Sequence, residues 1–359
     1  MKVSADFSKN NLDCLRLILA SIVALFHLCI LSGTPVFYAL GDHLSPHFAI
    51  RGFFVISGLL IYRSYTRSSS IKSYFEKRFR RIYPAYFTII VAAAITLCLL
   101  STLPASLYFG FGFWKYLGAN LLFLNFLAPS LPGVFTLNSM PAVNGALWTL
   151  KIEVAFYLFV PVMHYLCSRL GVKRVIATTF FLSCVWKFGF AFLGSINHAS
   201  AIYSIDSSRN FYSQLGSQFP GQLVYFCSGI LLFLYLDKLK LHFQSIFFVT
   251  AVLFIVGYYF KTENLDVLWI PGVVFVFGFW RYLGNFAKYG DFSYGVYIVH
   301  FPIVQTLIAC GLLKVNPVLF FATSVLAIAI GSFLMWHLIE SRFLSTQSHY
   351  RQIIASSSS

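Results

Sequence analysis

The sequence has little charge, and acidic residues are especially scarce. Only 10% of the 359 residues are charged, and 11 Asp and Glu stand against 26 Lys and Arg. By contrast, 58% of the residues are hydrophobic, 19% are aromatic and the mean hydropathy is +0.77. A soluble domain of this size cannot bury so much apolar surface, so the composition excludes that class. It predicts an all-α fold, a polytopic bundle of helices in a lipid bilayer.

The sequence also lacks the signals of disulfide-rich, metal-binding and nucleic-acid-binding proteins. The seven cysteines show neither a C-x-x-C pair nor metal-ligand spacing, so we expect packed thiols and no disulfide framework. His43 and His47 have i, i+4 spacing, but no further ligands are evident near them. The net charge of +15 is no sign of nucleic-acid binding here, because the cations lie between apolar runs. We therefore expect neither a metal nor a nucleic-acid partner.

Ten apolar runs have the length of a membrane-crossing helix. The stretch Tyr116–Pro129 is also apolar and uncharged but short, which predicts a re-entrant or interfacial segment. Residues 1–340 are expected to form one transmembrane domain, and 341–359 a short tail that is disordered at its serine-rich end. The predicted spans are 12–34, 48–65, 84–103, 145–168, 174–195, 219–236, 243–260, 264–282, 294–314 and 317–340.

The basic residues orient the predicted bundle. With ten spans, both termini lie on the same side of the membrane. If that side is the cytosol, most Lys and Arg residues lie there, above all those of Arg63–Arg81, and few such as Lys115 and Lys314 lie outside. Cytosolic loops of membrane proteins carry an excess of Lys and Arg. We therefore expect both termini in the cytosol and Pro35–His47 on the outer side.

The first predicted span contains two ionisable residues, Arg16 and His27. At about 100° and 1.5 Å per helical residue, His27 lies within about 20° of Arg16 and roughly 16 Å further along the axis. One helix face therefore carries a guanidinium near the cytosolic surface and an imidazole deeper in the membrane. Each residue alone also has a structural explanation, as a snorkelling arginine or a hydrogen-bonded histidine. Because ionisable side chains at membrane depth are costly, the aligned pair favours a functional role.

The densest basic cluster, Lys77–Arg81, lies at the cytosolic entrance to the third predicted span. Arg78 and Arg81 are three residues apart and share one face of a helix. Guanidinium groups bind phosphates in a bidentate manner, so this pair is suited to a phosphorylated ligand. The alternative is a positive-inside signal or a patch that contacts anionic lipid headgroups.

The fourth predicted span contains an acidic residue, Glu153, close to Lys151. By the predicted topology Glu153 lies about 12 Å from the outer surface, a depth similar to that of His27. A buried carboxylate needs a partner or a proton. Glu153 is therefore a candidate to orient His27 or raise its basicity. Alternatively, it forms an ion pair with Lys151 or Lys187 that only holds helices together.

A further polar group opens the ninth predicted span, in GDFSYGVYIVHFPI from Gly290 to Ile303. It contains Ser293, Tyr294, Tyr297 and His300. Tyrosines are common at membrane interfaces, and a helix histidine can serve packing alone. This group by itself therefore does not identify a site.

Five segments in order resemble the membrane-bound acyltransferase-3 family: LDCLRLILASIVALFH, FFVISGLLIY, YFEKRFRRIYPAYF, LWTLKIEVAFYL and FSYGVYIVHFP. Arg16 and His27 match its motif of Arg, ten residues and His, and Arg78 and Arg81 match its Arg-x-x-Arg motif. The resemblance covers about residues 12–340. It implies transfer of an acyl group, commonly acetyl, from a coenzyme A thioester to a hydroxyl of a cell-envelope carbohydrate. Arg51 departs from the family pattern, since many relatives carry an acid at that position. This departure bears on which acceptor is used more than on the type of reaction.

The residues and the resemblance together predict an integral membrane O-acyltransferase, multi-pass in the bacterial inner membrane. We expect Arg16, Arg78 and Arg81 to bind the phosphates of cytosolic acetyl-CoA, whose long arm is comparable with the Arg16–His27 distance. His27 is the expected general base on the acceptor hydroxyl, with Glu153 as its partner. The residues expected to contact the substrate are Trp148, Tyr294 and His300.

A transporter or flippase of an envelope metabolite is the alternative function. Ten spans with ionisable residues inside them also suit a proton relay. The lack of evident sequence repeats and the phosphate-type arginine pair argue against it.

Overall fold

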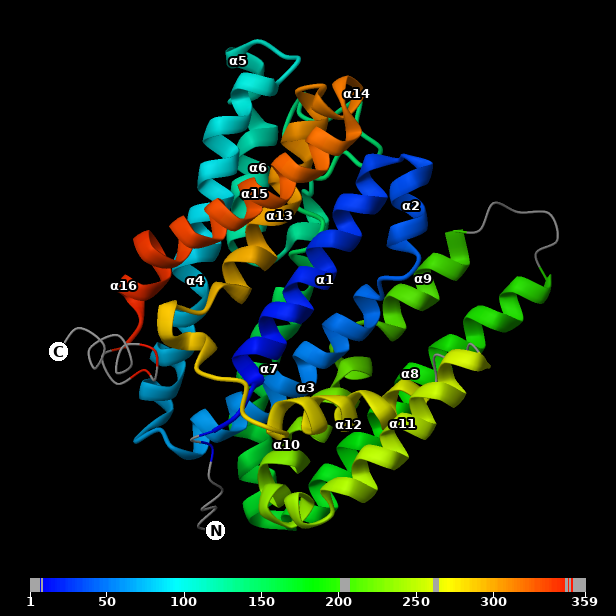
Figure 1. Ribbon diagram of the computed structural model, residues 1–359. Coiled ribbons are helices and arrows are strands. Elements are labelled where there is room, and N and C mark those ends of the chain that lie inside the picture. The colour runs from blue at the N-terminus through cyan, green and yellow to red at the C-terminus, as the bar shows by residue number, and fades with distance from the viewer. Residues whose placement is uncertain are drawn as a thin grey trace. The chain divides into compact units, whose positions relative to one another are not determined.

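The computed structural model describes residues 7, 9–200, 207–260, 265–345, 348 and 350, with the backbone alone for 196–200, 207–210 and 287. This part of the chain consists of helices joined by turns and loops and contains no β-strand (Figure 1). The all-α prediction is therefore confirmed. The predicted disorder of the final serines concerns residues outside the described ranges.

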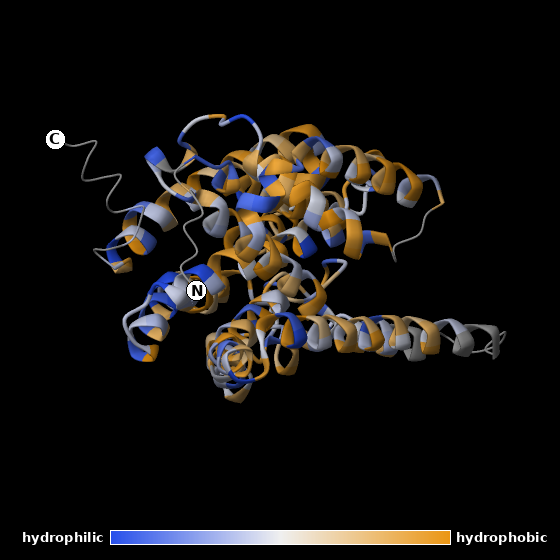
Figure 2. Cartoon of the chain, turned by 90° about the horizontal axis from the view of Figure 1, so that it is seen from below, coloured by the Kyte–Doolittle hydropathy of each residue, from blue (hydrophilic) through white to orange (hydrophobic). Residues whose placement is uncertain are grey.

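Among the described residues, eight helices are long and apolar enough to cross a membrane. Each overlaps one of eight predicted spans, although Pro35–Thr66, Ile71–Leu100 and Phe211–Leu241 begin earlier than predicted. The spans predicted at 243–260 and 264–282 are the shorter helices α11 (Phe243–Tyr259) and α12 (Asp266–Phe279). The helices are largely hydrophobic (Figure 2), and large apolar side chains such as Leu158 and Phe181 are exposed, as on a surface that lipid covers. The chain is thus a polytopic helical membrane protein. The number of crossings and the side of the termini stay predictions.

Two compact units make up the chain, and unit 1 comprises residues 1–12, 51–74 and 152–283. In this unit α8 packs against α9 and α10, and α11 packs against α12. The helices α3 and α7 begin with residues of unit 2 and continue in unit 1. The helices of unit 1 besides α11 and α12 are α3 (Pro46–Thr66), α7 (Trp148–Leu170), α8 (Val172–Ser200), α9 (Ser207–Gly216) and α10 (Phe219–Leu241).

Unit 2 comprises residues 13–50, 75–151 and 284–359, and its helices α13 and α15 pack side by side. Its α-helices are α1 (Leu12–Ser32), α2 (Pro35–Gly41), α4 (Ile71–Thr96), α5 (Ala105–Tyr108), α6 (Phe111–Leu121), α13 (Phe292–Ala309), α14 (Leu312–Val315), α15 (Pro317–Leu334) and α16 (Ser341–Phe343). Between α15 and α16 lies a π-helical stretch, η5 (Met335–Glu340). Short 3-10 turns lie at Leu97–Leu100, Asn125–Leu127 and Phe286–Tyr289.

The predicted re-entrant stretch consists of the end of α6 and the 3-10 turn that follows it. The buried Asn120 side chain donates to the carbonyls of Tyr116 and Ala128, and Asn125 donates to the Asn120 side chain. The two bonds from Asn120 satisfy backbone carbonyls, including that of Ala128 outside any helix, which is why irregular backbone is stable here.

The helix that carries the basic cluster begins earlier than expected. The third predicted span was placed from residue 84, but α4 begins at Ile71 and passes through Pro84. The charged residues and Pro84 lie at the N-terminal boundary of the apolar run. They do not mark the start of the helix, because a helix can extend beyond the bilayer into water. Arg78 and Arg81 therefore lie on regular helix, where residues three apart share a face.

Close approach of α3 and α10 in unit 1 depends on two glycines. A Cβ atom built on Gly58 would overlap the backbone of Phe226, and one on Gly229 would overlap the backbone of Val55. We expect Gly229→Ala to lower the stability by about 1–3 kcal/mol or more, because backbone cannot move aside as a side chain can. Thermal unfolding in detergent measures this. The matched control is Gly189→Ala on α8, where no atom lies within 4 Å of the new methyl group. An unchanged melting temperature for Gly229→Ala would contradict the prediction.

Candidate active site

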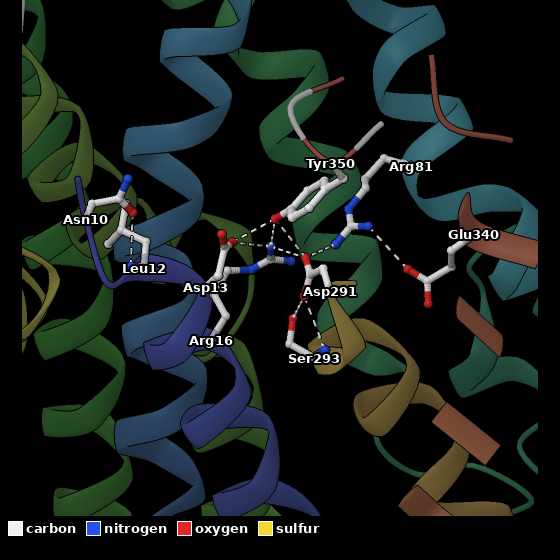
Figure 3. Close-up of polar contacts among 9 residues, drawn as sticks. All are labelled: Asn10, Leu12, Asp13, Arg16, Arg81, Asp291, Ser293, Glu340 and Tyr350. Atoms are coloured by element: carbon white, nitrogen blue, oxygen red, sulfur yellow. Dashed lines mark hydrogen bonds and ion pairs between the residues drawn. The ribbon is translucent and has the colours of Figure 1, made fainter. Parts of the chain in front are cut away.

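Asp291 is the centre of a buried ionic cluster in unit 2 (Figure 3). It is the N-cap of α13, and its Oδ1 accepts hydrogen bonds from the Ser293 backbone N–H (3.2 Å) and hydroxyl (2.5 Å). Its Oδ2 accepts from Arg16 Nη1 at 2.5 Å and from Arg81 Nη2. The Asp291 side chain is only 1% exposed, whereas Arg16 and Arg81 are 16% and 12% exposed. One buried carboxylate thus joins the guanidinium groups of α1 and α4.

The charge state of Asp291 follows from these contacts. Burial by itself would raise the pKa of the Asp291 carboxyl, but Arg16, Arg81 and the hydrogen bond from Ser293 hold that pKa well below its usual range. Asp291 is therefore ionised throughout the neutral range, and its charge balances part of the charge of the two arginines.

Three more residues, Asp13, Tyr350 and Glu340, belong to the cluster. The Tyr350 hydroxyl lies 2.7 Å from Asp13 Oδ1, to which it donates, and it accepts from Arg16 Nη1 at 3.3 Å. The guanidinium carbon (Cζ) of Arg81 lies over the Tyr350 ring, 5.5 Å from the ring centroid. Glu340, at the end of η5, accepts from Arg81 Nη1 through its Oε2 at 3.2 Å. Tyr350, which follows α16 in the sequence, thus belongs to this polar cluster.

Two of the three arginines predicted to bind the donor are therefore together. Arg16 and Arg81 meet at Asp291, and Arg78 lies one turn before Arg81 on α4, partly buried. Sequence interpretation did not identify Asp291, Glu340 or Tyr350. A signal was present for Asp291: it is one of few acids, it directly precedes an apolar helix, and Ser293 follows two residues later, as at an N-cap.

The second feature of unit 2 is a pair of histidines. His27 Nδ1 lies 2.9 Å from His300 Nε2, and the two rings are 16° from parallel with centroids 5.1 Å apart. His300 is completely buried, and its Nδ1 lies 3.1 Å from the backbone carbonyl of Val296. His27, from α1, is partly exposed and also contacts the Phe301 ring.

The two features lie along the same pair of helices. Arg16 and His27 belong to α1, while Asp291 and His300 belong to the start and middle of α13. Residue numbers rise from the ionic cluster to the histidine pair on both helices, so α1 and α13 run in the same direction. The eleven residues between Arg16 and His27 correspond to roughly 16 Å along the helix axis.

The other predicted site residues have the following surroundings. Glu153 belongs to unit 1, where it accepts from the Tyr157 hydroxyl at 2.6 Å, so its contact with His27 in unit 2 stays a prediction. Tyr294 donates to the carbonyl of Ile82 at 3.0 Å and is buried. Trp148 is the first residue of α7 and is partly buried. Roles of these residues in substrate binding stay predictions.

The three cations predicted inside other spans, Arg51, Lys151 and Lys187, have identifiable partners. Lys187 forms an ion pair with Asp266 at 3.3 Å, and Arg51 binds the same carboxylate. This buried carboxylate connects α3, α8 and α12 of unit 1. Lys151 lies over the Phe126 ring at 4.8 Å. Over the described part of the chain, no three His, Cys, Asp or Glu side chains form a group that can hold a metal ion.

Comparison with known proteins places the chain in a family. Residues 9–337 match a family model described as an acyltransferase domain. The chain is 30% identical over 331 residues to nodulation protein 10 of Rhizobium leguminosarum bv. viciae, covering 84% of this chain and 85% of that protein. It is 27% identical over 360 residues to an O-acetyl transferase of Shigella phage Sf6, covering 94% and 97% of the two chains. No solved structure matches the chain.

Proposed function

This chain belongs to the acyltransferase domain family as a membrane O-acetyltransferase, and we propose that it takes acetyl from cytosolic acetyl-CoA to a hydroxyl of an extracytoplasmic cell-surface polysaccharide or its lipid-linked precursor. The proposed location is the bacterial inner membrane. Membership of the family favours acyl transfer over the alternative of a transporter or flippase.

One observation carries this proposal: the ionic cluster and the histidine pair lie on the same two helices, separated along them. Acetyl-CoA carries its phosphates at one end and its thioester at the other, joined by a long, thin arm. Phosphates held by Arg78, Arg81 and Arg16 would leave the arm to extend along α1 toward His27. The roughly 16 Å between Arg16 and His27 is comparable with that arm.

The proposed chemistry is a direct transfer assisted by His27. The acceptor hydroxyl oxygen attacks the thioester carbonyl while His27 takes its proton. The new C–O ester bond forms as the C–S bond breaks, and the leaving sulfur receives the proton to give the coenzyme A thiol. Glu153 is the proposed partner that orients His27 or balances its charge. The proposed substrate contacts are those of Trp148, Tyr294 and His300.

The direct test is acetyl transfer from labelled acetyl-CoA by the protein in lipid vesicles, with envelope polysaccharide from cells that lack the protein as acceptor. We expect label in the polysaccharide that mild alkali releases, as an ester requires. The acetyl content of polysaccharide from cells with and without the protein is the companion measurement. Equal acetylation in both, with no label incorporated, would contradict the proposal.

The arginine cluster gives a separate prediction about donor binding. Replacing Arg78 with Ala should weaken coenzyme A binding about 10- to 100-fold, since a hydrogen bond between charged groups contributes about 1.5–3 kcal/mol. Arg81→Lys should also weaken it, because Lys keeps the charge but lacks the planar pair of donors. Isothermal titration with purified variants measures both affinities.

The control for this prediction is Arg80→Ala. Arg80 lies on the same helix but is 45% exposed and pairs with Glu76, so its loss should leave coenzyme A affinity unchanged. If Arg78→Ala and Arg81→Lys both bind coenzyme A as the wild type does, the basic cluster contacts lipid headgroups and not the donor.

A further inference from the structure

The hydrogen bonds of the histidine pair determine where its protons lie. The carbonyl oxygen of Val296 can only accept, so His300 must carry a hydrogen on Nδ1, which lies 3.1 Å from it. A neutral imidazole has a single N–H, so the Nε2 of a neutral His300 is a bare acceptor. That Nε2 lies 2.9 Å from His27 Nδ1. Two bare nitrogens would repel each other at this distance, so His27 must carry its hydrogen on Nδ1.

The surroundings of His300 support its neutral form. Its side chain is completely buried, and its described neighbours are His27, the Val296 carbonyl and the rings of Tyr297 and Phe301. None of these groups carries a negative charge that would balance an imidazolium. A buried charge without a partner is costly, so the neutral ring is the stable form.

The geometry of the two rings fits this hydrogen bond. The rings are within 16° of parallel, and their centroids are 5.1 Å apart although the two nitrogens are 2.9 Å apart. The centroid distance exceeds the nitrogen distance by about the width of one ring. Both nitrogens therefore lie near the line between the centroids, and the N–H of one ring points at the in-plane lone pair of the other. The rings meet edge to edge and are not stacked face on face.

We propose that His300 is a positioning residue that fixes His27 in the tautomer with Nδ1 protonated, so that Nε2 of His27 is the basic atom. This inference rests on the proposed role of His27 as the general base. When Nε2 takes the proton of the acceptor hydroxyl, the Nδ1–H bond to His300 stabilises the imidazolium that forms. The proton then passes from Nε2 to the departing sulfur, and the pair returns to its starting state.

Two amide variants of His300 form a matched pair for the test. Gln carries its amide oxygen near the position of Nε2, where it accepts from His27 Nδ1–H. Asn reaches only the position of Nδ1, where it donates to the Val296 carbonyl, so His27 loses the acceptor that His300 supplies and keeps only the backbone of Val23. In acetyl transfer we expect kcat of His300→Asn to fall about 10- to 10³-fold, because a general base contributes about 10²- to 10⁴-fold and losing its orientation removes part of that contribution. His300→Gln should retain most of the activity, and both should bind coenzyme A as the wild type does.

The tautomer itself is measured by nitrogen NMR of the wild-type protein in bilayers, with ¹⁵N-labelled histidine and His27 assigned from the spectrum of His27→Gln. We expect His27 to be protonated on Nδ1. Protonation on Nε2 would overturn the inference, and so would equal activity of the Asn and Gln variants. If Nδ1 is protonated but His27→Ala still transfers acetyl groups, the tautomer stands and the proposed function of His27 fails. The NMR result on wild-type protein decides the tautomer even if a variant does not fold.

Discussion

Replacing His27 with Ala is expected to abolish detectable acetylation of the polysaccharide while coenzyme A still binds nearly normally. A positioned general base contributes about 10²- to 10⁴-fold to the rate, and no other described ring nitrogen adjoins His27 except that of His300, which is wholly buried. Donor binding should persist because Arg16 lies roughly 16 Å away along α1, in the cluster that also holds Arg81 of α4. The measurement is the acetyl content of the product at matched levels of folded protein, with coenzyme A binding assayed in parallel.

Three comparisons make this result specific. His337→Ala removes an exposed histidine of η5 in the same unit and should leave activity unchanged. His27→Gln keeps hydrogen-bonding capacity without a basic nitrogen, so near-normal acetylation by it would contradict the general-base role. Loss of coenzyme A binding together with activity in His27→Ala would instead place His27 in the donor site.

The helices could be predicted from the sequence because their signal is local. Apolar runs of bilayer length gave the bounds of α1 and α15 to within a few residues, except that the last span ends in the π-helical η5. The start of α4 was wrong because the run of apolar residues begins later than the helix. In each case the sequence reports where a helix can lie in lipid, which is not always where the helix begins and ends.

The residues that meet in the site could be predicted only in part. Arg16 and His27 share one helix, so helix geometry alone aligns them. Their partners Asp291 and His300 lie more than 270 residues away in the sequence. The spacing of residues within one helix does not predict which distant side chains it contacts. The predicted contact of His300 with substrate stays a prediction, and its position beside His27 was not foreseen. Asp291 was not predicted at all, although burying two arginines inside a bundle requires an acid close to them.

The partners of Arg16 and Arg81 also bear on how the donor can bind. Both guanidinium groups already contact Asp291, so a phosphate at this cluster would add to an existing ion pair and would not meet free cations. Arg78 lies one turn away from Arg81 on the same helix. Substitution of Asp291 therefore tests the ionic framework that holds Arg16 and Arg81.

Asp291→Asn is expected to destabilise the protein by about 3–5 kcal/mol, the cost of removing one partner from a buried ion pair. Asn has the same shape and is as good an N-cap as Asp, so the start of α13 keeps its cap and the loss reflects charge alone. The two guanidinium groups that remain are only 16% and 12% exposed, so water cannot replace the carboxylate. Denaturant unfolding of the purified protein in detergent measures the difference.

The control is Asp42→Asn, the same substitution at an exposed position of unit 2, which should change stability by less than about 0.5 kcal/mol. The pH dependence gives a second check. The pKa of Asp291 is lowered in the folded protein, so its contribution is complete above the ordinary carboxyl pKa of about 3.9 and is lost as the pH falls below that value. The difference in unfolding free energy between wild type and Asp291→Asn should therefore narrow as the pH falls below about 3.9. A variant as stable as the wild type at neutral pH would show that Arg16 and Arg81 do not depend on Asp291 for their charge balance.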